Sequence, residues 1–139
     1  LLKHAHHAFD VDRPGKDSYR HRQAGASEVL VASSQRWVMM HELRSAPEPS
    51  MAELLSRFSA CDLVLVEGYK HAPIAKLEVH RAALGKPLLH PHDRHIVAVA
   101  SDSDVATDLP RLDLNEPQAI VRFICDYLES HHECNPATP

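Results

Sequence analysis

Residues 63–70 read LVLVEGYK, and this stretch decides the fold class. Four apolar residues precede Glu67 and Gly68, and a short continuous apolar run is typical of a strand that is covered on both faces, as in a parallel sheet. Two further runs have the same character: VLVA at 29–32 and IVAVA at 96–100. We therefore predict three parallel strands at these positions.

Helical patterns lie between and after these runs. We predict three helices: one capped by Asp17-Ser18 and ended by Gly25, one that begins with a capping box formed by Ser50 and Glu53, and one that follows Asn115 with Pro117 in its first turn. Strands that alternate with helices predict an α/β fold with a mostly parallel sheet.

Two other segments predict additional strands at an antiparallel edge. One spans 36–43 around Trp37, and the other spans 74–80, where Ala75, Leu77 and Val79 alternate with Lys76, Glu78 and His80. Because exposed strand edges tend to be paired or protected, we expect these two segments to form the seam of a homodimer.

Composition narrows the class of protein further. The chain has 139 residues, with 15 Lys and Arg against 19 Asp and Glu, a formal net charge of −4. It has no basic stripe of the kind that nucleic-acid binding requires. Its three cysteines have no CxxC spacing, and no apolar run approaches the roughly 20 residues of a membrane helix. We expect a single cytoplasmic domain that binds neither nucleic acid nor membranes.

In open α/β sheets, ligands lie outside the carboxyl ends of the strands. Glu67 is placed to bind Mg²⁺, and Gly68 would let a phosphate approach the backbone; the alternative is an acid that ends a strand before a turn. Asp102 could accept hydrogen bonds from the N1–H and N2–H₂ groups of guanine, or could instead cap backbone N–H groups of its own loop.

The segment before residue 20 is rich in histidine and acid. Asp10 and Asp12 could face Mg²⁺ and phosphates, or could pair with Arg13 or Lys16. His4, His6 and His7 could bind a transition metal together with a ligand from His90, His92 or His95, or could be solvated. The tetrapeptide GKDS at 15–18 is not a P-loop, since Asp10 stands where the motif needs glycine and Asp17 where it needs Ser or Thr.

The chain resembles the MobB family of molybdopterin-guanine dinucleotide biosynthesis proteins. The resemblance is carried by KHAHH at 3–7, DVDRPGKDSY at 10–19, RQAGA at 22–26, VAS at 31–33 with Arg36-Trp37, LVLVEGYKH at 63–71, IAK at 74–76 and RHIVAVASD at 94–102.

That resemblance implies a P-loop GTP-binding protein of the SIMIBI type. It implies an accessory factor, at most a slow GTPase and with no catalytic residue assigned, that assists the molybdenum cofactor guanylyltransferase; molybdopterin is a further candidate partner. GTP and Mg²⁺ would be the cofactors. Glu67, Asp10 and Asp12 would lie at the metal, and Lys3, His4, Gly68 and Asp102 at the nucleotide.

Family members carry a strand, a P-loop and a helix before the segment that corresponds to Leu1-Leu2-Lys3. We therefore expect one MobB-like GTP-binding domain over 1–139 that lacks this N-terminal part and binds GTP poorly. A His-rich metal-handling protein and a nucleotide-free dimeric scaffold on the same fold are the alternatives.

Overall fold

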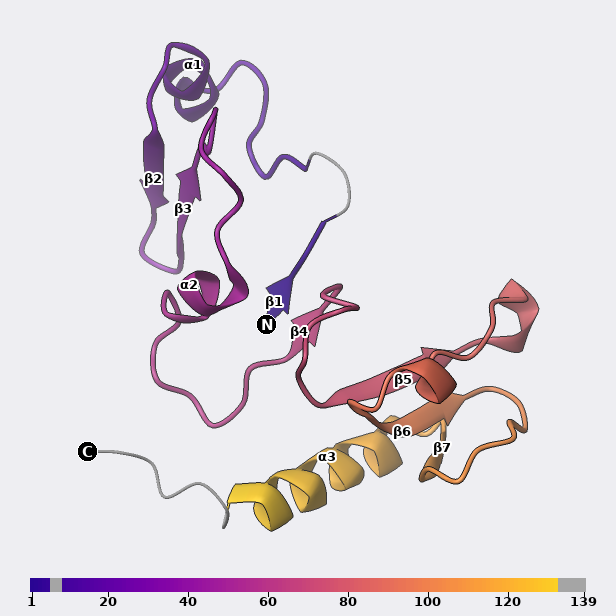
Figure 1. Ribbon diagram of the computed structural model, residues 1–139. Helices are drawn as coiled ribbons and strands as arrows, with labels where there is room; N and C mark the ends of the chain where they lie inside the picture. Colours follow the sequence, from indigo (N-terminus) through magenta and orange to yellow (C-terminus); the bar gives the residue numbers. More distant parts are fainter. Residues whose placement is uncertain (6–8, 133–139) are drawn as a thin grey trace. The chain divides into compact units, whose positions relative to one another are not determined.

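The chain forms two compact units, Leu1–Lys70 and His71–Pro139 (Figure 1). The computed structural model describes residues 1–5 and 9–132. Both units combine strands with helices, and two of the three sheets formed by the described residues are parallel, which confirms the predicted α/β class. The prediction of one domain over the whole chain stays a prediction.

In the first unit, a short parallel ladder joins β1 (Leu2–Lys3) to β4 (Val66–Glu67). The amide of Leu2 donates to the Leu65 carbonyl at 2.7 Å, and the amide of His4 donates to the Glu67 carbonyl at 2.8 Å. The prediction of a buried strand over 63–66 is wrong in its bounds, since Leu65 is 52% exposed. The ladder pairs Val66 and Glu67 with the two residues of β1, and the rest of the apolar run, residues 63–65, is not part of a strand.

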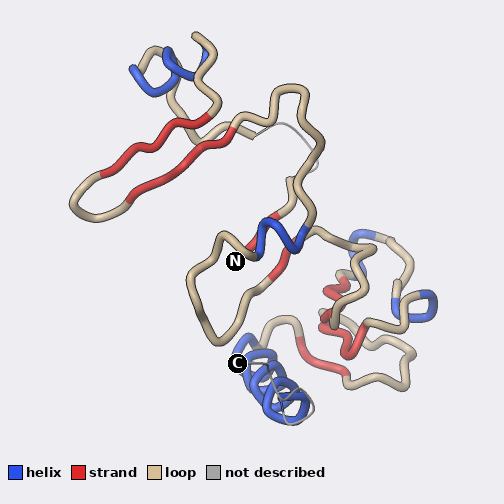
Figure 2. Tube along the Cα trace, turned by 60° about the vertical axis from the view of Figure 1, so that its left-hand side comes forward, coloured by secondary structure: helices blue, strands red, loops and turns tan. Residues whose placement is uncertain are grey.

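The strand predicted around 29–32 is also corrected. β2 (Glu28–Ala32) pairs antiparallel with β3 (Trp37–His41), and Figure 2 shows the two as long segments joined by one loop. β2 is therefore neither parallel nor covered on both faces, since Leu30 is 57% exposed. The reason is the connection, residues 33–36: parallel neighbours need a crossover of about a dozen residues or more. The antiparallel strand predicted at 36–43 is confirmed.

Local signals place the helices of the first unit. α2 (Met51–Leu55) has the predicted capping box, in which Ser50 Oγ accepts from the Glu53 amide and the Glu53 carboxylate accepts from the Ser50 amide. α1 (Asp17–Gln23) begins one residue earlier than predicted, because Lys16 occupies the N-cap. Gly25 ends α1 with a φ of 114°, as a helix-terminating glycine does.

The second unit contains a parallel sheet in the order β5 (Lys76–His80), β6 (Ile96–Ser101), β7 (Arg111–Asp113). β6 is the core strand, as predicted: Ala98, Val99 and Ala100 are fully buried. The predicted final helix is α3 (Pro117–His132), which lies next to β7 (Figure 1).

β5 differs from the prediction in two ways. It is parallel to β6, because residues 81–95, with the 3₁₀ turns η1 (Ala82–Leu84) and η2 (His90–His92), form a crossover between them. Its faces are also reversed: Glu78 is 7% exposed and Val79 is 59% exposed. Glu78 is buried because its carboxylate accepts from the amides of Leu89 and His90, at 2.6 and 2.9 Å.

Candidate functional site

The carboxyl end of the β1–β4 ladder brings four of the predicted site residues together. Lys3 and Glu67 lie opposite each other in the register, and Lys3 Nζ is 2.9 Å from Glu67 Oε1. Both side chains are more than half exposed, at 62% and 59%, so this ion pair faces water. Such a pair contributes little to stability, and both groups remain accessible to a ligand.

His4 and Gly68 follow directly at the same edge. His4 Nε2 lies 2.9 Å from Glu48 Oε1, and the His4 ring lies 5.0 Å from the ring of Tyr69. Gly68 has a φ of 105°, and a Cβ built on it would come within 2.8 Å of His4 Cβ. His4 thus occupies the space that the missing side chain of Gly68 leaves open.

Asp10 and Asp12 are brought together with Arg22, a partner that sequence reasoning missed. Arg22 Nη2 donates to Asp10 Oδ2 at 2.6 Å and Arg22 Nη1 to Glu42 Oε1 at 3.0 Å, while Arg22 Nε is 3.6 Å from Asp12 Oδ2. The hydrogen bond from Arg22 lowers the pKa of the Asp10 carboxyl. The sequence signal was weak, because Arg22 is twelve and ten residues away from the two acids along the chain.

The residues of this edge offer part of a site for magnesium and a nucleotide. In the part of the chain that the structure describes, no group of three His, Cys, Asp or Glu side chains lies close enough to hold a metal ion. Glu67 nevertheless offers an exposed carboxylate of the type that Mg²⁺ prefers, and Lys3 beside it offers a cation for a phosphate. The fit therefore requires that phosphate oxygens and water complete the coordination. His6 and His7 lie outside the described residues.

Asp102 belongs to the second unit, at the carboxyl end of β6. Its Oδ1 accepts from the amide of Ala82 at 3.0 Å, so one of its oxygens already caps a backbone group. A depression of about 440 Å³ opens beside it, lined by the segment that follows β6 and by β7 with Asn115. Arg111 pairs with Asp104 at its rim.

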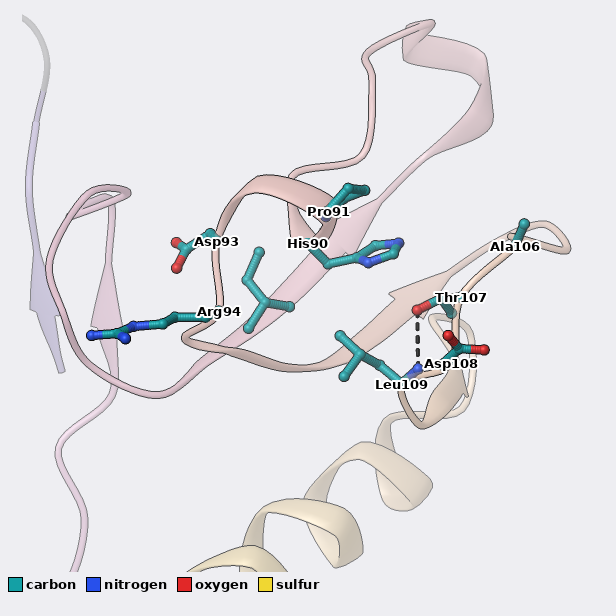
Figure 3. A pocket seen from close by; sticks show the side chains of 9 residues that line it. His90, Pro91, Asp93, Arg94, Ala106, Thr107, Asp108 and Leu109 are labelled. Atoms are coloured by element: carbon teal, nitrogen blue, oxygen red, sulfur yellow. Dashed lines mark hydrogen bonds between the residues drawn. The ribbon is translucent and has the colours of Figure 1, made fainter.

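A second depression, of about 610 Å³, lies at the opposite edge of the same sheet, before β6 and β7 (Figure 3). Its wall includes His90, Asp93 and Thr107, and Thr107 Oγ1 accepts from the amide of Leu109 at 3.1 Å. Its lining includes His90, named from the sequence as a possible transition-metal ligand, but none of the residues expected at the nucleotide or at Mg²⁺. Since ligands of open α/β sheets lie at the carboxyl edge, this depression is not the candidate site.

The fold and the β1–β4 edge define an α/β protein that carries acids and a lysine at the carboxyl ends of parallel strands. The family model described as "Molybdopterin guanine dinucleotide synthesis protein B" matches residues 1–102. The chain belongs to this family, MobB, which confirms the resemblance seen in the sequence.

Two curated relatives support the assignment, and both are named "Molybdopterin-guanine dinucleotide biosynthesis adapter protein". The protein from Escherichia coli (strain K12) is 43% identical over 135 residues, which cover 95% of this chain and 77% of the relative. The protein from Haemophilus influenzae is 40% identical over 135 residues, which cover 95% and 74%.

No helix in the described residues is long and apolar enough to cross a membrane.

Proposed function

We propose that the chain is a cytoplasmic accessory protein of molybdopterin-guanine dinucleotide biosynthesis, on a P-loop-type fold of the SIMIBI class. It binds GTP with Mg²⁺ and assists the nucleotidyltransferase, molybdenum cofactor guanylyltransferase, that forms the dinucleotide from molybdopterin. The observation that carries the proposal is 43% identity across 95% of the chain to a relative named as an adapter protein in that biosynthesis.

The β1–β4 edge supports the nucleotide part of the proposal. Glu67 offers a carboxylate to the metal, and Lys3, 2.9 Å from it, offers a cation to the phosphates. Glu67 would hold Mg²⁺ and Lys3 would hold the phosphates of GTP, so each would exchange its present partner for the opposite charge on the ligand. Asp10 and Asp12 contribute charge near the metal only after release from Arg22.

The pathway role is tested by reconstitution. Formation of the guanine dinucleotide by purified guanylyltransferase, molybdopterin and Mg-GTP is measured with and without the chain. We expect faster or more complete formation when the chain is present; identical time courses refute the role.

The nucleotide site is tested separately by NMR, which detects even millimolar binding. Mg-GTP is expected to shift the amide resonances of residues 3, 4, 67 and 68, and Glu67→Gln is expected to remove the dependence on Mg²⁺. Glu129→Gln, which removes an exposed acid from α3, serves as the control. Shifts that do not depend on Mg²⁺ in the unmodified chain contradict the role of Glu67.

Self-association completes the proposal. One face of the β2–β3 hairpin exposes Leu30, Trp37 and Met39 by 57%, 68% and 46%, and β5 is an edge strand of its sheet. Exposed apolar area of this kind marks interaction sites, and we propose that these segments form the seam of a homodimer. A monomeric mass in sedimentation at micromolar concentration refutes it.

A further inference from the structure

Glu48 is an acid at the β1–β4 edge that no sequence motif marks. It lies in the connection 42–50 between β3 and α2, with Pro47 before it and Pro49 after it. Its Oε1 lies 2.9 Å from His4 Nε2. A residue far along the chain thus reaches the candidate nucleotide site.

The backbone around Glu48 has little freedom. The ring of a proline fixes its own φ, and a residue that precedes proline is confined to extended conformations, as Glu48 is by Pro49. The connection is also anchored at both ends, because Arg44 Nη2 donates to the carbonyl of Ala26 at 3.0 Å and Ser50 forms the capping box of α2. The carboxylate is therefore presented from a stiff backbone, which lowers the entropy that is lost when its side chain is held.

The ring of His4 is held by packing and by this hydrogen bond. The His4 side chain is 29% exposed and lies 5.0 Å from the ring of Tyr69, at an angle of 44°. A carboxylate can only accept, so the bond to Glu48 places a hydrogen on His4 Nε2. Packing limits where the ring lies, whereas a hydrogen bond is directional and sets which edge of the ring faces Glu48.

A carboxylate beside a phosphate site has two opposing effects on a nucleotide. Its negative charge repels the phosphates, although the charge of Glu48 is screened by salt because this side chain is 61% exposed. Its hydrogen bond orders the ring of His4 in advance, which removes an ordering cost that ligand binding otherwise bears. The two effects change the affinity in opposite directions, so an experiment can separate them.

We propose that Glu48 is a positioning residue of the candidate nucleotide site, which holds the ring of His4 at the β1–β4 edge through the hydrogen bond from Nε2. The inference rests on the proposed function, because that function places a nucleotide at this edge. Glu48 acts through His4 and contacts neither the phosphates nor the metal.

The first measurement uses the chain without a ligand. NOEs between the ring protons of His4 and Tyr69, and the order parameter of the His4 ring C–H bonds, report how firmly the ring is held. Glu48→Ala is expected to weaken these NOEs and to lower the order parameter, because the bond is lost. Glu48→Gln is expected to restore both, since the amide oxygen of Gln also accepts from Nε2.

The second measurement is a titration with Mg-GTP, followed by the amide resonances of residues 67 and 68. Glu48→Ala is expected to raise the Kd about twofold to tenfold, which corresponds to the ordering of one side chain. Glu48→Gln is expected to bind at least as tightly as the unmodified chain, because it keeps the bond and removes the repelling charge. Asp62→Ala, which removes an exposed acid from the same unit, is the control and should change neither measurement.

The possible results separate the inference from the proposed function. If the ring is equally ordered in Glu48→Ala and in the unmodified chain, packing alone holds it and the inference is refuted. If Glu48→Ala binds Mg-GTP as tightly as the unmodified chain or more tightly, or if Glu48→Gln behaves as Glu48→Ala, the hydrogen bond has no positioning role; the inference is refuted and the function stands. If Mg-GTP shifts no resonance of the unmodified chain, the nucleotide site fails and the inference fails with it.

Discussion

Replacing Gly68 by alanine tests whether the β1–β4 edge depends on the close approach of His4. Gly68 has a φ of 105°, and the new Cβ would lie 2.8 Å from His4 Cβ and 3.0 Å from the His4 carbonyl oxygen. A left-handed backbone costs a residue other than glycine about 1–2 kcal/mol. Overpacking adds about 1–3 kcal/mol. The atoms that the new Cβ meets are the backbone and Cβ of His4, which cannot swing away as the end of a flexible side chain would.

Gly25→Ala is the matched control. Gly25 lies in the same unit with a φ of 114°, and nothing lies within 4 Å of a Cβ built on it. It therefore carries the backbone cost without the clash. The difference between the two variants should be the clash alone, about 1–3 kcal/mol.

Hydrogen exchange reports this difference locally. The amide of His4 donates to the Glu67 carbonyl at 2.8 Å and exchanges when β1 separates from β4. An opening free energy lower by this amount accelerates its exchange by about fivefold to 150-fold relative to Gly25→Ala. Urea unfolding followed by Trp37 fluorescence measures the effect on the whole unit. Equal exchange rates of the His4 amide in the two variants would refute the reasoning.

Three further outcomes are expected. Arg22→Met should lower the urea midpoint of the first unit well below that of the control Arg20→Met, because it leaves Asp12 buried without its cation; equal midpoints contradict this role of Arg22. Glu78→Ala should destabilise the second unit by about 2–4 kcal/mol in urea unfolding, since two backbone amides lose their acceptor. Lys76 lowers the pKa of Asp93, so the stability from this pair is present above the unfolded pKa, near 3.8, and is lost as the pH falls below it. In Asp93→Asn, the free energy of unfolding, measured by circular dichroism, should therefore fall less steeply with decreasing pH in this range.

Local signals in the sequence predicted much of the secondary structure. The capping box of Ser50 and Glu53, the glycine at 25 and the helix after Asn115 depend on neighbours within a few residues, and each is found in the structure. The core strand β6 was predicted for a similar reason, since a run buried on both faces must be apolar throughout.

The direction of strands was harder to predict. The apolar run at 29–32 resembles that at 96–100, yet only the second lies in a parallel sheet. What separates them is the connection: four residues lead from β2 to β3, while the crossover at 81–95 leads from β5 to β6. The length of a connection is visible in the sequence, but its meaning depends on which strands pair.

For the candidate site too, some features could be predicted from the sequence and others depend on contacts between distant residues. The sequence by itself determined the family and placed Glu67, Gly68 and Asp102 after strands, because the residue types and their order are written along the chain. Only the tertiary structure decided that Lys3 pairs with Glu67, that Asp10 and Asp12 both lie beside Arg22, and that Glu78 rather than Val79 is buried. Each of these depends on a partner distant in the sequence, and a pattern of neighbouring residues contains no information about which distant group satisfies a charge.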